Sequence, residues 1–222
     1  MPNAFRTGCA LAIGLAAAAL SGVAAHADII YTITETGTIA SGTSLGVFGA
    51  RGTNLAGQTF SVTQTFDATL STDNAGGTAF NYLTPATSAA IVTVGNNTYS
   101  IVSNNNANNE YFIGSRAGGY FYDEVYSTTY SATSNASYTG YVYAPSTNFL
   151  ANDALSQTLV YTLPNTTGSY STFSGPDSTY FTGTLTSISV NAAQPAVPEP
   201  GSVALLGAGL AGLGWLRRRR VI

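Results

Sequence analysis

The sequence is poor in the side chains on which most catalysts and nucleic-acid-binding proteins depend. Its 222 residues include one cysteine, one histidine, one methionine and one tryptophan, and all seven basic residues are arginines. Between residues 28 and 197 only Arg51 and Arg116 oppose nine acidic residues, which gives this stretch a formal charge of −7. A surface that binds nucleic acid needs clustered Lys or Arg. The composition therefore excludes nucleic acid as a partner.

The same shortage limits the catalytic chemistry that the chain can perform. Ser-His-Asp and Cys-His arrangements need an imidazole, but the one histidine, His26, and the one cysteine, Cys9, both lie near the N-terminus. Zinc sites use the same two residue types, and a Schiff base needs a lysine, which the sequence lacks. Asp73-Asn74 and Asp123-Glu124 offer oxygen ligands for calcium, but neither belongs to a recognisable calcium loop. We therefore expect no cofactor and assign no metal site.

Carboxylates leave one enzymatic alternative open. Two carboxylates a few ångströms apart suffice for glycoside hydrolysis, and the candidates are Glu35, Glu110, Asp123 and Glu124. Acidic residues scattered over exposed strands and loops would also keep a Thr-rich surface soluble, and this role does not require them to meet in a cleft. We expect a protein without enzymatic activity, with a surface glycan-active enzyme as the alternative.

Residues 28–190 predict a single all-β domain, an antiparallel, jelly-roll-like β-sandwich. Ser, Thr, Asn, Gly and Tyr dominate it, and turn clusters recur at short intervals, as is typical of sandwiches and barrels. With no cysteine in this stretch, core packing and sheet hydrogen bonds must hold the domain without disulfides. The clearest strand is 58–70, whose apolar face, broken only by Gln64, contains Phe60, Val62, Phe66, Ala68 and Leu70.

Other segments show weaker strand signals. Residues 89–94 and 98–102 flank Gly95-Asn96-Asn97 and predict a hairpin, because Gly and Asn tolerate the positive φ of short turns. Residues 29–39 alternate between apolar residues and threonine. Further strands are expected at 111–113, 120–126, 137–143, 157–163 and 180–190.

The N-terminus has the parts of a secretory signal peptide. Arg6 begins a short basic region, and an apolar stretch, expected to be a helix, runs from Cys9 to Val23. Ala25 and Ala27 then provide the small-x-small pattern at which signal peptidase cuts. The predicted signal peptide is 1–27.

The C-terminus carries a proline-containing triplet, an apolar run and a basic cluster, in that order. Pro198, Glu199 and Pro200 precede an uncharged run at about 201–216. As a transmembrane helix this run would rise roughly 24 Å, against roughly 30 Å for a hydrocarbon core. The cluster that follows resists translocation and favours a cytoplasmic C-terminus; it consists of Arg217, Arg218, Arg219 and Arg220.

Together these three parts resemble the PEP-CTERM sorting signal of exopolysaccharide-producing bacteria with two membranes. In that family the tail is a transient anchor in the inner membrane, and an exosortase cuts near the triplet and passes the body to the surface. The resemblance implies that Pro198, Glu199 and Pro200 carry recognition and that the helix and arginines are discarded. An ordinary anchor that is never cut is the alternative. A related description of the same segment comes from some ice-binding proteins, which by itself implies no ice binding.

The predicted organisation is a signal peptide at 1–27, a β-sandwich at 28–190, a Pro/Ala linker at 191–197 and the sorting signal at 198–222. The resemblance implies signal peptidase and an exosortase-type enzyme as partners. It also implies a final location on the cell surface or outside the cell, in an exopolysaccharide-rich biofilm matrix.

Tyrosines are concentrated in one third of the predicted domain. Tyr120, Tyr122, Tyr141 and Tyr143 occur there at two-residue spacing, which predicts rings on a common strand face. Aromatic faces stack on sugar rings while polar neighbours bond the hydroxyls, so these four residues are predicted to contact glycan. Tyrosine is also a good strand former, and the same rings could simply line the sandwich.

The rows of threonine suggest a minor alternative. Regularly spaced threonines on a flat sheet can order water or ice, but the sequence has no internal repeat to align them across strands. The function expected from the sequence is therefore that of a non-enzymatic, exported surface or matrix protein that binds glycan or acts as an adhesin.

Overall fold

The structure is a computed structural model that describes residues 29–68, 72–75, 80–85, 87–104, 108–145, 148–164 and 168–193. Within these ranges the fold is all-β and contains no α-helix, which confirms the predicted fold class. Residues Asp28–Ala193 form one compact unit. The predicted terminal helices lie outside the described residues, as do Ala25, Ala27, Pro198, Glu199, Pro200 and Arg217–Arg220.

The described residues form thirteen strands and short 3-10 helices at Arg116–Gly118 and Pro176–Ser178. The strands are β1 (Ile30–Ser44), β2 (Thr53–Asn54), β3 (Thr59–Asp67), β4 (Thr72–Ala75), β5 (Phe80–Thr84), β6 (Thr87–Val94), β7 (Asn97–Ser103), β8 (Glu110–Gly114), β9 (Asp123–Ser131), β10 (Ala136–Ala144), β11 (Leu159–Thr162), β12 (Gly168–Ser174) and β13 (Tyr180–Ala193).

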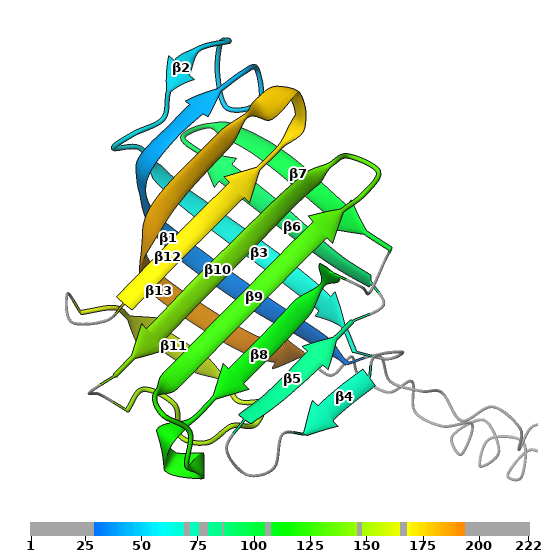
Figure 1. Ribbon diagram of the computed structural model, residues 1–222, viewed down its shortest axis with the longest axis vertical. Coiled ribbons are helices and arrows are strands. Elements are labelled where there is room, and N and C mark those ends of the chain that lie inside the picture. Colours follow the sequence, from blue (N-terminus) through cyan, green and yellow to red (C-terminus); the bar gives the residue numbers. More distant parts are fainter. Residues whose placement is uncertain are drawn as a thin grey trace, which may run out of the picture. The chain divides into compact units, whose positions relative to one another are not determined.

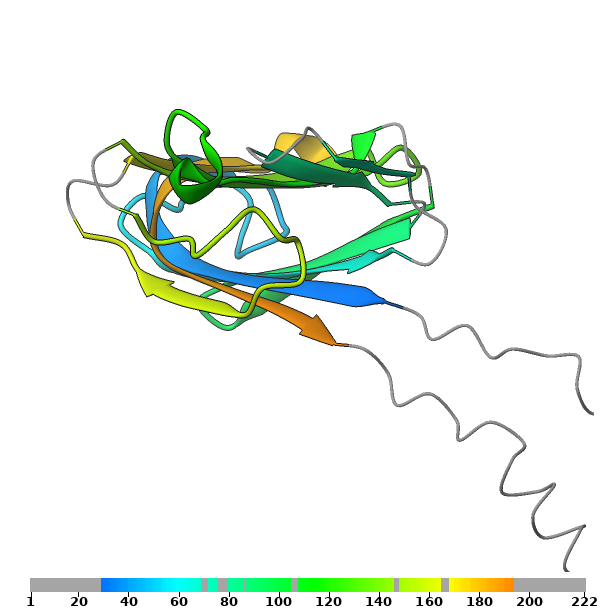
Figure 2. The ribbon, with the colours of Figure 1, turned by 90° about the horizontal axis from the view of Figure 1, so that it is seen from below.

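All of these strands belong to one antiparallel sheet that folds back on itself. The order is β4-β5-β8-β9-β10-β12-β13-β1-β3-β6-β7, with β11 paired to β13 and β2 to β1. Figures 1 and 2 show the result as two layers. We call β4, β5, β8, β9, β10 and β12 the first layer, and β13, β1, β3, β6 and β7 the second layer.

Strands β1 and β13 join the layers. β13 pairs with β12 of the first layer through Tyr180–Gly183, and with β1 along nearly its whole length. The β1–β13 pairing shifts register after Thr36 and again after Ile39. Such bulges bend a strand and increase its twist. The two shifts therefore lie where the chain must pass from one layer toward the other.

Local sequence signals predicted several strands well. The hairpin is confirmed as β6 and β7, with a turn of only Gly95 and Asn96, because Asn97 already pairs with Val94. Gly95 has φ +58°, which a residue with a side chain rarely adopts. Strand β3 is confirmed at Thr59–Asp67, and Gln64 is as deeply buried as its apolar neighbours.

Other strands were placed wrongly or missed. β9 begins at Asp123 and not at Tyr120, because Arg116–Gly118 forms a 3-10 turn that precedes it. β13 continues to Ala193, so three residues of the predicted linker pair with Ile30–Thr32 of β1. β12 was missed because its sequence, GSYSTFS, does not alternate between apolar and polar residues as a half-buried strand usually does.

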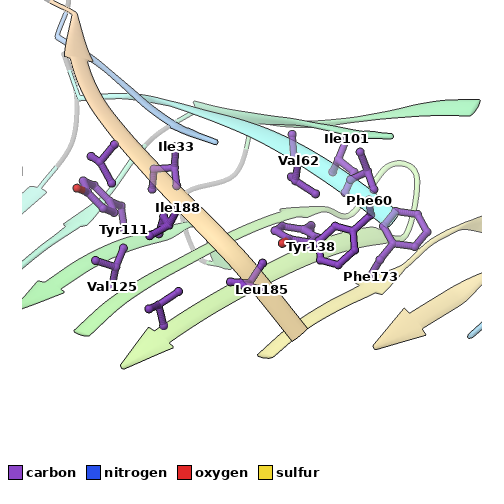
Figure 3. Packing of buried hydrophobic residues seen from close by; sticks show 14 of the residues in the cluster. Ile33, Phe60, Val62, Ile101, Tyr111, Val125, Tyr138, Phe173, Leu185 and Ile188 are labelled. Carbon is purple, nitrogen blue, oxygen red and sulfur yellow. The ribbon is translucent and has the colours of Figure 1, made fainter. Parts of the chain in front are cut away.

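The core lies between the two layers, where inward side chains from both meet (Figure 3). Ile33 and Val62 of the second layer and Val125 of the first are at most 1% exposed. At one end, Phe173 stacks with Phe181 at a centroid separation of 5.4 Å. Because alternate residues face opposite ways, each inward residue leaves its neighbours on an outer face.

A buried polar network crosses the core from one layer to the other. From the second layer, Glu35 of β1 and Gln64 of β3 reach toward β9 and β10. Tyr138 donates its hydroxyl to Glu35 Oε2 at 2.7 Å. Ser127 donates to Gln64 Oε1 at 2.6 Å, and Gln64 Nε2 donates to Thr129 Oγ1 at 3.0 Å. These contacts tie particular positions of the two layers to each other.

Ser127 lies between the two buried side chains of the second layer. Its hydroxyl oxygen is 2.6 Å from Gln64 Oε1 and 3.5 Å from Glu35 Oε1, so its bond to Gln64 is the shorter of the two. Burial raises the pKa of Glu35 from 4.5 to about 7, although hydrogen bonds from Tyr138 and Ser127 lower it. Gly140 leaves room for the carboxyl group, because a Cβ there would collide with it.

We predict that Glu35→Gln removes a pH dependence of stability. The folded pKa of Glu35 lies above its ordinary value, so the free energy of unfolding should fall as pH rises from about 4.5 to about 7. Glutamine keeps an acceptor for Tyr138 and a donor for Ser127 but cannot ionise. Above pH 7 the variant should be more stable than the wild type by about 3 kcal/mol, measured by urea unfolding.

Well below pH 4.5 the two proteins should have similar free energies of unfolding, since Glu35 is then protonated in both the folded and the unfolded state. A difference between wild type and variant that stays constant from about pH 4.5 to about pH 8 would contradict the raised pKa.

Candidate functional site

The outer face of the first layer carries a continuous row of aromatic rings. We call these residues the aromatic row: Phe80 on β5, Phe112 on β8, Tyr120 and Tyr122 in the loop before β9, Tyr143 and Tyr141 on β10, and Tyr170 on β12. Successive ring centroids are 5.6, 5.8, 6.0, 6.0, 5.4 and 5.0 Å apart. Tyr126 on β9 branches from Tyr141 at 6.3 Å.

The rings of the row are accessible to a ligand. Tyr141 and Tyr143 alternate along β10 with the buried residues Gly140, Val142 and Ala144, so they point away from the core. Both are half-buried by their neighbours on the face, and Tyr170 at the end of the row is 45% exposed. The row is therefore a surface platform and not a part of the core.

The four tyrosines that the sequence predicted as glycan contacts lie close together, but they do not all share one strand face as expected. Tyr141 and Tyr143 lie on a strand as expected. Tyr120 and Tyr122 do not share a strand face, because they belong to the loop that follows the Arg116–Gly118 turn. That loop folds over the end of the layer, so Tyr122 still contacts Tyr143.

Asp123 fixes the loop that carries Tyr120 and Tyr122. Its side chain is fully buried at the start of β9. Oδ1 accepts the backbone N–H of Arg116 at 2.8 Å, while Oδ2 accepts those of Phe149 and Leu150. One carboxylate thus ties the start of this loop to the segment that follows β10, and Asp123 is a positioning residue.

A groove continues the face on the side of Tyr126. It has a volume of about 670 Å³. Its lining is polar and aromatic and consists of Tyr82, Thr84, Asn108, Asn109, Glu110, Tyr126, Thr128, Tyr130, Ser137 and Thr139. Thr128 and Thr139 lie with their hydroxyl oxygens 3.0 Å apart across β9 and β10. The groove therefore adds hydroxyl and amide groups beside the rings.

The four candidate catalytic carboxylates are not gathered in one cleft. Glu35 lies in the core, and Asp123 accepts backbone N–H groups. Glu110 pairs with Thr128, four residues beyond Glu124 on β9. At about 3.3 Å per residue, the backbone positions of Glu110 and Glu124 are about 13 Å apart along the sheet. Glu110 lines the groove on the side of Tyr126, and Glu124 is not among its lining residues.

Glu110 and Glu124 instead flank the rings. Burial raises the pKa of both carboxyl groups, and a hydrogen bond from Tyr141 partly offsets this for Glu124. Burial and then the charge of Glu124 raise the pKa of Tyr120 and Tyr141, while burial and then Glu110 raise that of Tyr126. The phenols of Tyr120, Tyr126 and Tyr141 are therefore neutral and can donate hydrogen bonds.

Sequence reasoning missed several members of the face, namely Phe80, Phe112 and Tyr170. Phe112 lies between Tyr111 and Ile113 in a predicted strand, so its opposite parity could have identified it as outward. Phe80 and Tyr170 belong to β5 and β12, which were not predicted.

The outer face of the second layer aligns serine and threonine across strands, although the sequence has no repeat. One row, from β13 to β7, contains Ser187, Thr36, Ser61, Thr93 and Thr98. Its hydroxyls bond one another, as in Thr36–Ser187 at 2.6 Å. The next row, through Thr34 and Thr63, is interrupted by Ile91, and the row after it, through Thr32 and Thr65, is interrupted by Ala89 and Val102. The hydroxyls of these three rows therefore do not form a continuous two-dimensional array, and ice binding remains a prediction.

Two negative findings apply to the described ranges. No three His, Cys, Asp or Glu side chains there lie close enough to hold a metal ion. Within the same ranges, no helix has the length and apolar character needed to cross a membrane. The predicted membrane helix at 201–216 lies outside them.

Comparison with known proteins identifies the C-terminal segment. Residues 196–220 match the family model described as the PEP-CTERM protein-sorting motif, which confirms the resemblance drawn from the sequence. No curated protein and no solved structure matches the chain. The motif marks an exported protein that an exosortase-type enzyme sorts to the cell surface.

We predict that Asp123→Asn loosens the loop of Tyr120 and Tyr122. The new amide N–H would face backbone N–H groups that now have an acceptor, so the free energy of unfolding should fall by about 1–3 kcal/mol. Hydrogen exchange should become faster at the amides of Arg116, Phe149 and Leu150.

The matched control is Asp177→Asn, which removes an exposed carboxylate from the short 3-10 helix at Pro176–Ser178. Equal exchange rates at those three amides in Asp123→Asn and in the wild type would refute the role of Asp123.

Proposed function

We propose that this exported protein is a non-enzymatic component of the cell surface or extracellular matrix that binds polysaccharide through the aromatic row. The observation that carries the proposal is the unbroken line of outward rings, with centroid separations of 5.0 to 6.0 Å between Phe80 and Tyr170. Aromatic faces bury the apolar face of a ring-shaped ligand, and tyrosine adds a polar handle.

The dimensions of the row favour a chain over a single sugar. From β5 to β12 the row crosses four strand spacings, about 19 Å at about 4.8 Å each. The neighbouring groove supplies hydroxyls of Thr128 and Thr139 and the side chain of Asn108, which can bond sugar hydroxyls. An extended polymer would contact several rings at once, so weak contacts at each ring would add up.

The separate positions of the four candidate carboxylates favour binding without hydrolysis. The backbone positions of Glu110 and Glu124 are about 13 Å apart along the sheet, and Glu35 and Asp123 have structural partners. Export by way of the sorting motif would bring the aromatic row to polysaccharide outside the cell.

The proposed route includes a transient stage in the inner membrane. Signal peptidase would cut after Ala27, the apolar run at 201–216 would hold the protein in the membrane, and the exosortase-type enzyme would cut near Pro198–Pro200. The match to the sorting motif supports this route.

We predict that Tyr141→Ala and Tyr143→Ala each weaken polysaccharide binding roughly tenfold, the effect of losing a ring contact of about 1.4 kcal/mol. Affinity gel electrophoresis with soluble polysaccharides measures the change, and circular dichroism checks the fold. Both side chains lie outside the core, so truncation should leave the protein folded.

Tyr180→Ala is the matched control, because Tyr180 is 50% exposed and is not a member of the row. The proposal fails if folded Tyr141→Ala and Tyr143→Ala proteins migrate like Tyr180→Ala on every polysaccharide, or if the wild type binds none.

The route is tested by the intact mass of the protein recovered from the native cell surface and medium. We predict a mass that corresponds to a start near Asp28 and an end near Pro198, with or without added sugar. A mass that retains residues 201–222 would show a permanent anchor and contradict the transient stage.

A further inference from the structure

We infer that the aromatic row selects polysaccharides by charge, accepting neutral chains and chains of amino sugars and rejecting chains of acidic sugars. The inference rests on the proposed function and names the class of ligand. It starts from the two carboxylates that flank the rings, Glu124 beside Tyr141 and Glu110 beside Tyr126.

Both carboxylates are placed to act on a ligand that lies on the rings. They are half-buried on the outer face, and Glu110 also lines the groove. Tyr141 donates a hydrogen bond to Glu124, which holds this carboxylate next to the ring that Tyr143 and Tyr170 also contact. A sugar stacked on Tyr141 would therefore lie within reach of the Glu124 carboxylate.

Positive charge that could compensate is scarce. In the described part of the chain the cations are Arg51 and Arg116. Arg51 lies in the loop between β1 and β2. Arg116 is exposed in the loop before Tyr120, and its Nη1 donates to the carbonyl of Pro145, two residues after Tyr143, at 3.1 Å. The two carboxylates therefore set the local sign of the potential around Tyr141 and Tyr126, away from this arginine.

This arrangement discriminates between sugar chains that have the same shape. A uronate would bring a third carboxylate close to two that are already partly desolvated, and like charges repel more strongly where water is excluded. A protonated amino group would pair with Glu110 or Glu124, and it would also be attracted to the faces of the tyrosine rings. A neutral chain meets neither effect.

Isothermal titration of the full protein with three oligosaccharides of equal length tests the inference. The probes are a β-1,4-glucose, a β-1,4-glucosamine and a galacturonate oligomer, at low and moderate salt. We expect glucosamine to bind at least as tightly as glucose, and galacturonate to bind roughly tenfold more weakly or worse. The advantage of glucosamine should shrink as salt screens the charges.

The double variant Glu110→Gln/Glu124→Gln links the selectivity to these residues. Glutamine keeps an acceptor for Tyr141 and removes the charge, so the ratios of glucosamine and galacturonate affinities to that of glucose should move toward one. The matched control, Asp177→Asn, removes an exposed carboxylate away from the row and should leave the ratios as in the wild type.

Equal binding of galacturonate and glucose by the wild type, or ratios that do not change in the double variant, would overturn the charge selection while leaving glycan binding in place. Failure of all three oligomers to bind would overturn the proposed function, and the selectivity with it.

Discussion

The pairing of β1 with β13 is the constraint on which the rest of the structure depends. These strands lie at the centre of the sheet order, between β12 on one side and β3 on the other, so they hold both layers. Their register shifts after Thr36 and Ile39 let a continuous sheet bend until its faces meet. With no disulfide in this stretch of the chain, the closure depends on hydrogen bonds and on the apolar side chains that it buries.

The buried polar network gives this closure its particular alignment. Apolar contacts tolerate small shifts of one layer over the other, but Glu35 meets Tyr138, and Gln64 meets Ser127 and Thr129, in only one arrangement. A buried polar group without a partner is costly, so a shift of the layers would be penalised. The network stabilises one arrangement at the expense of keeping an ionisable group in the core. Its raised pKa predicts that the stability of the folded protein falls as pH rises from about 4.5 to about 7.

The proposed binding face consists of the outward side chains of the same strands that build the core. In β10, Tyr138 and Val142 point inward while Tyr141 and Tyr143 point outward, so a single strand serves the core and the platform. The core fixes the position of the outward rings, and Asp123 fixes the loop that continues them. Because rings and acids are numerous on this face and cations are few, we propose that it binds uncharged or positively charged ligands with flat apolar faces.

Much of this protein could be predicted from local pattern. The alternation of Phe60, Val62 and Phe66, the Gly95-Asn96 turn and the C-terminal motif each depend on residues that are close in sequence. Glu35 has the same parity as Tyr31 and Ile33, which indicates burial, but its partners Ser127 and Tyr138 lie about a hundred residues away. β12 has no apolar period and forms only because β10 and β13 offer it pairing on both sides. The sequence by itself determined the all-β class, the export route and which residue types could bind a ligand. Only the tertiary structure decided which tyrosines share a face and which acids are buried, because both depend on pairing between strands that are distant in the chain.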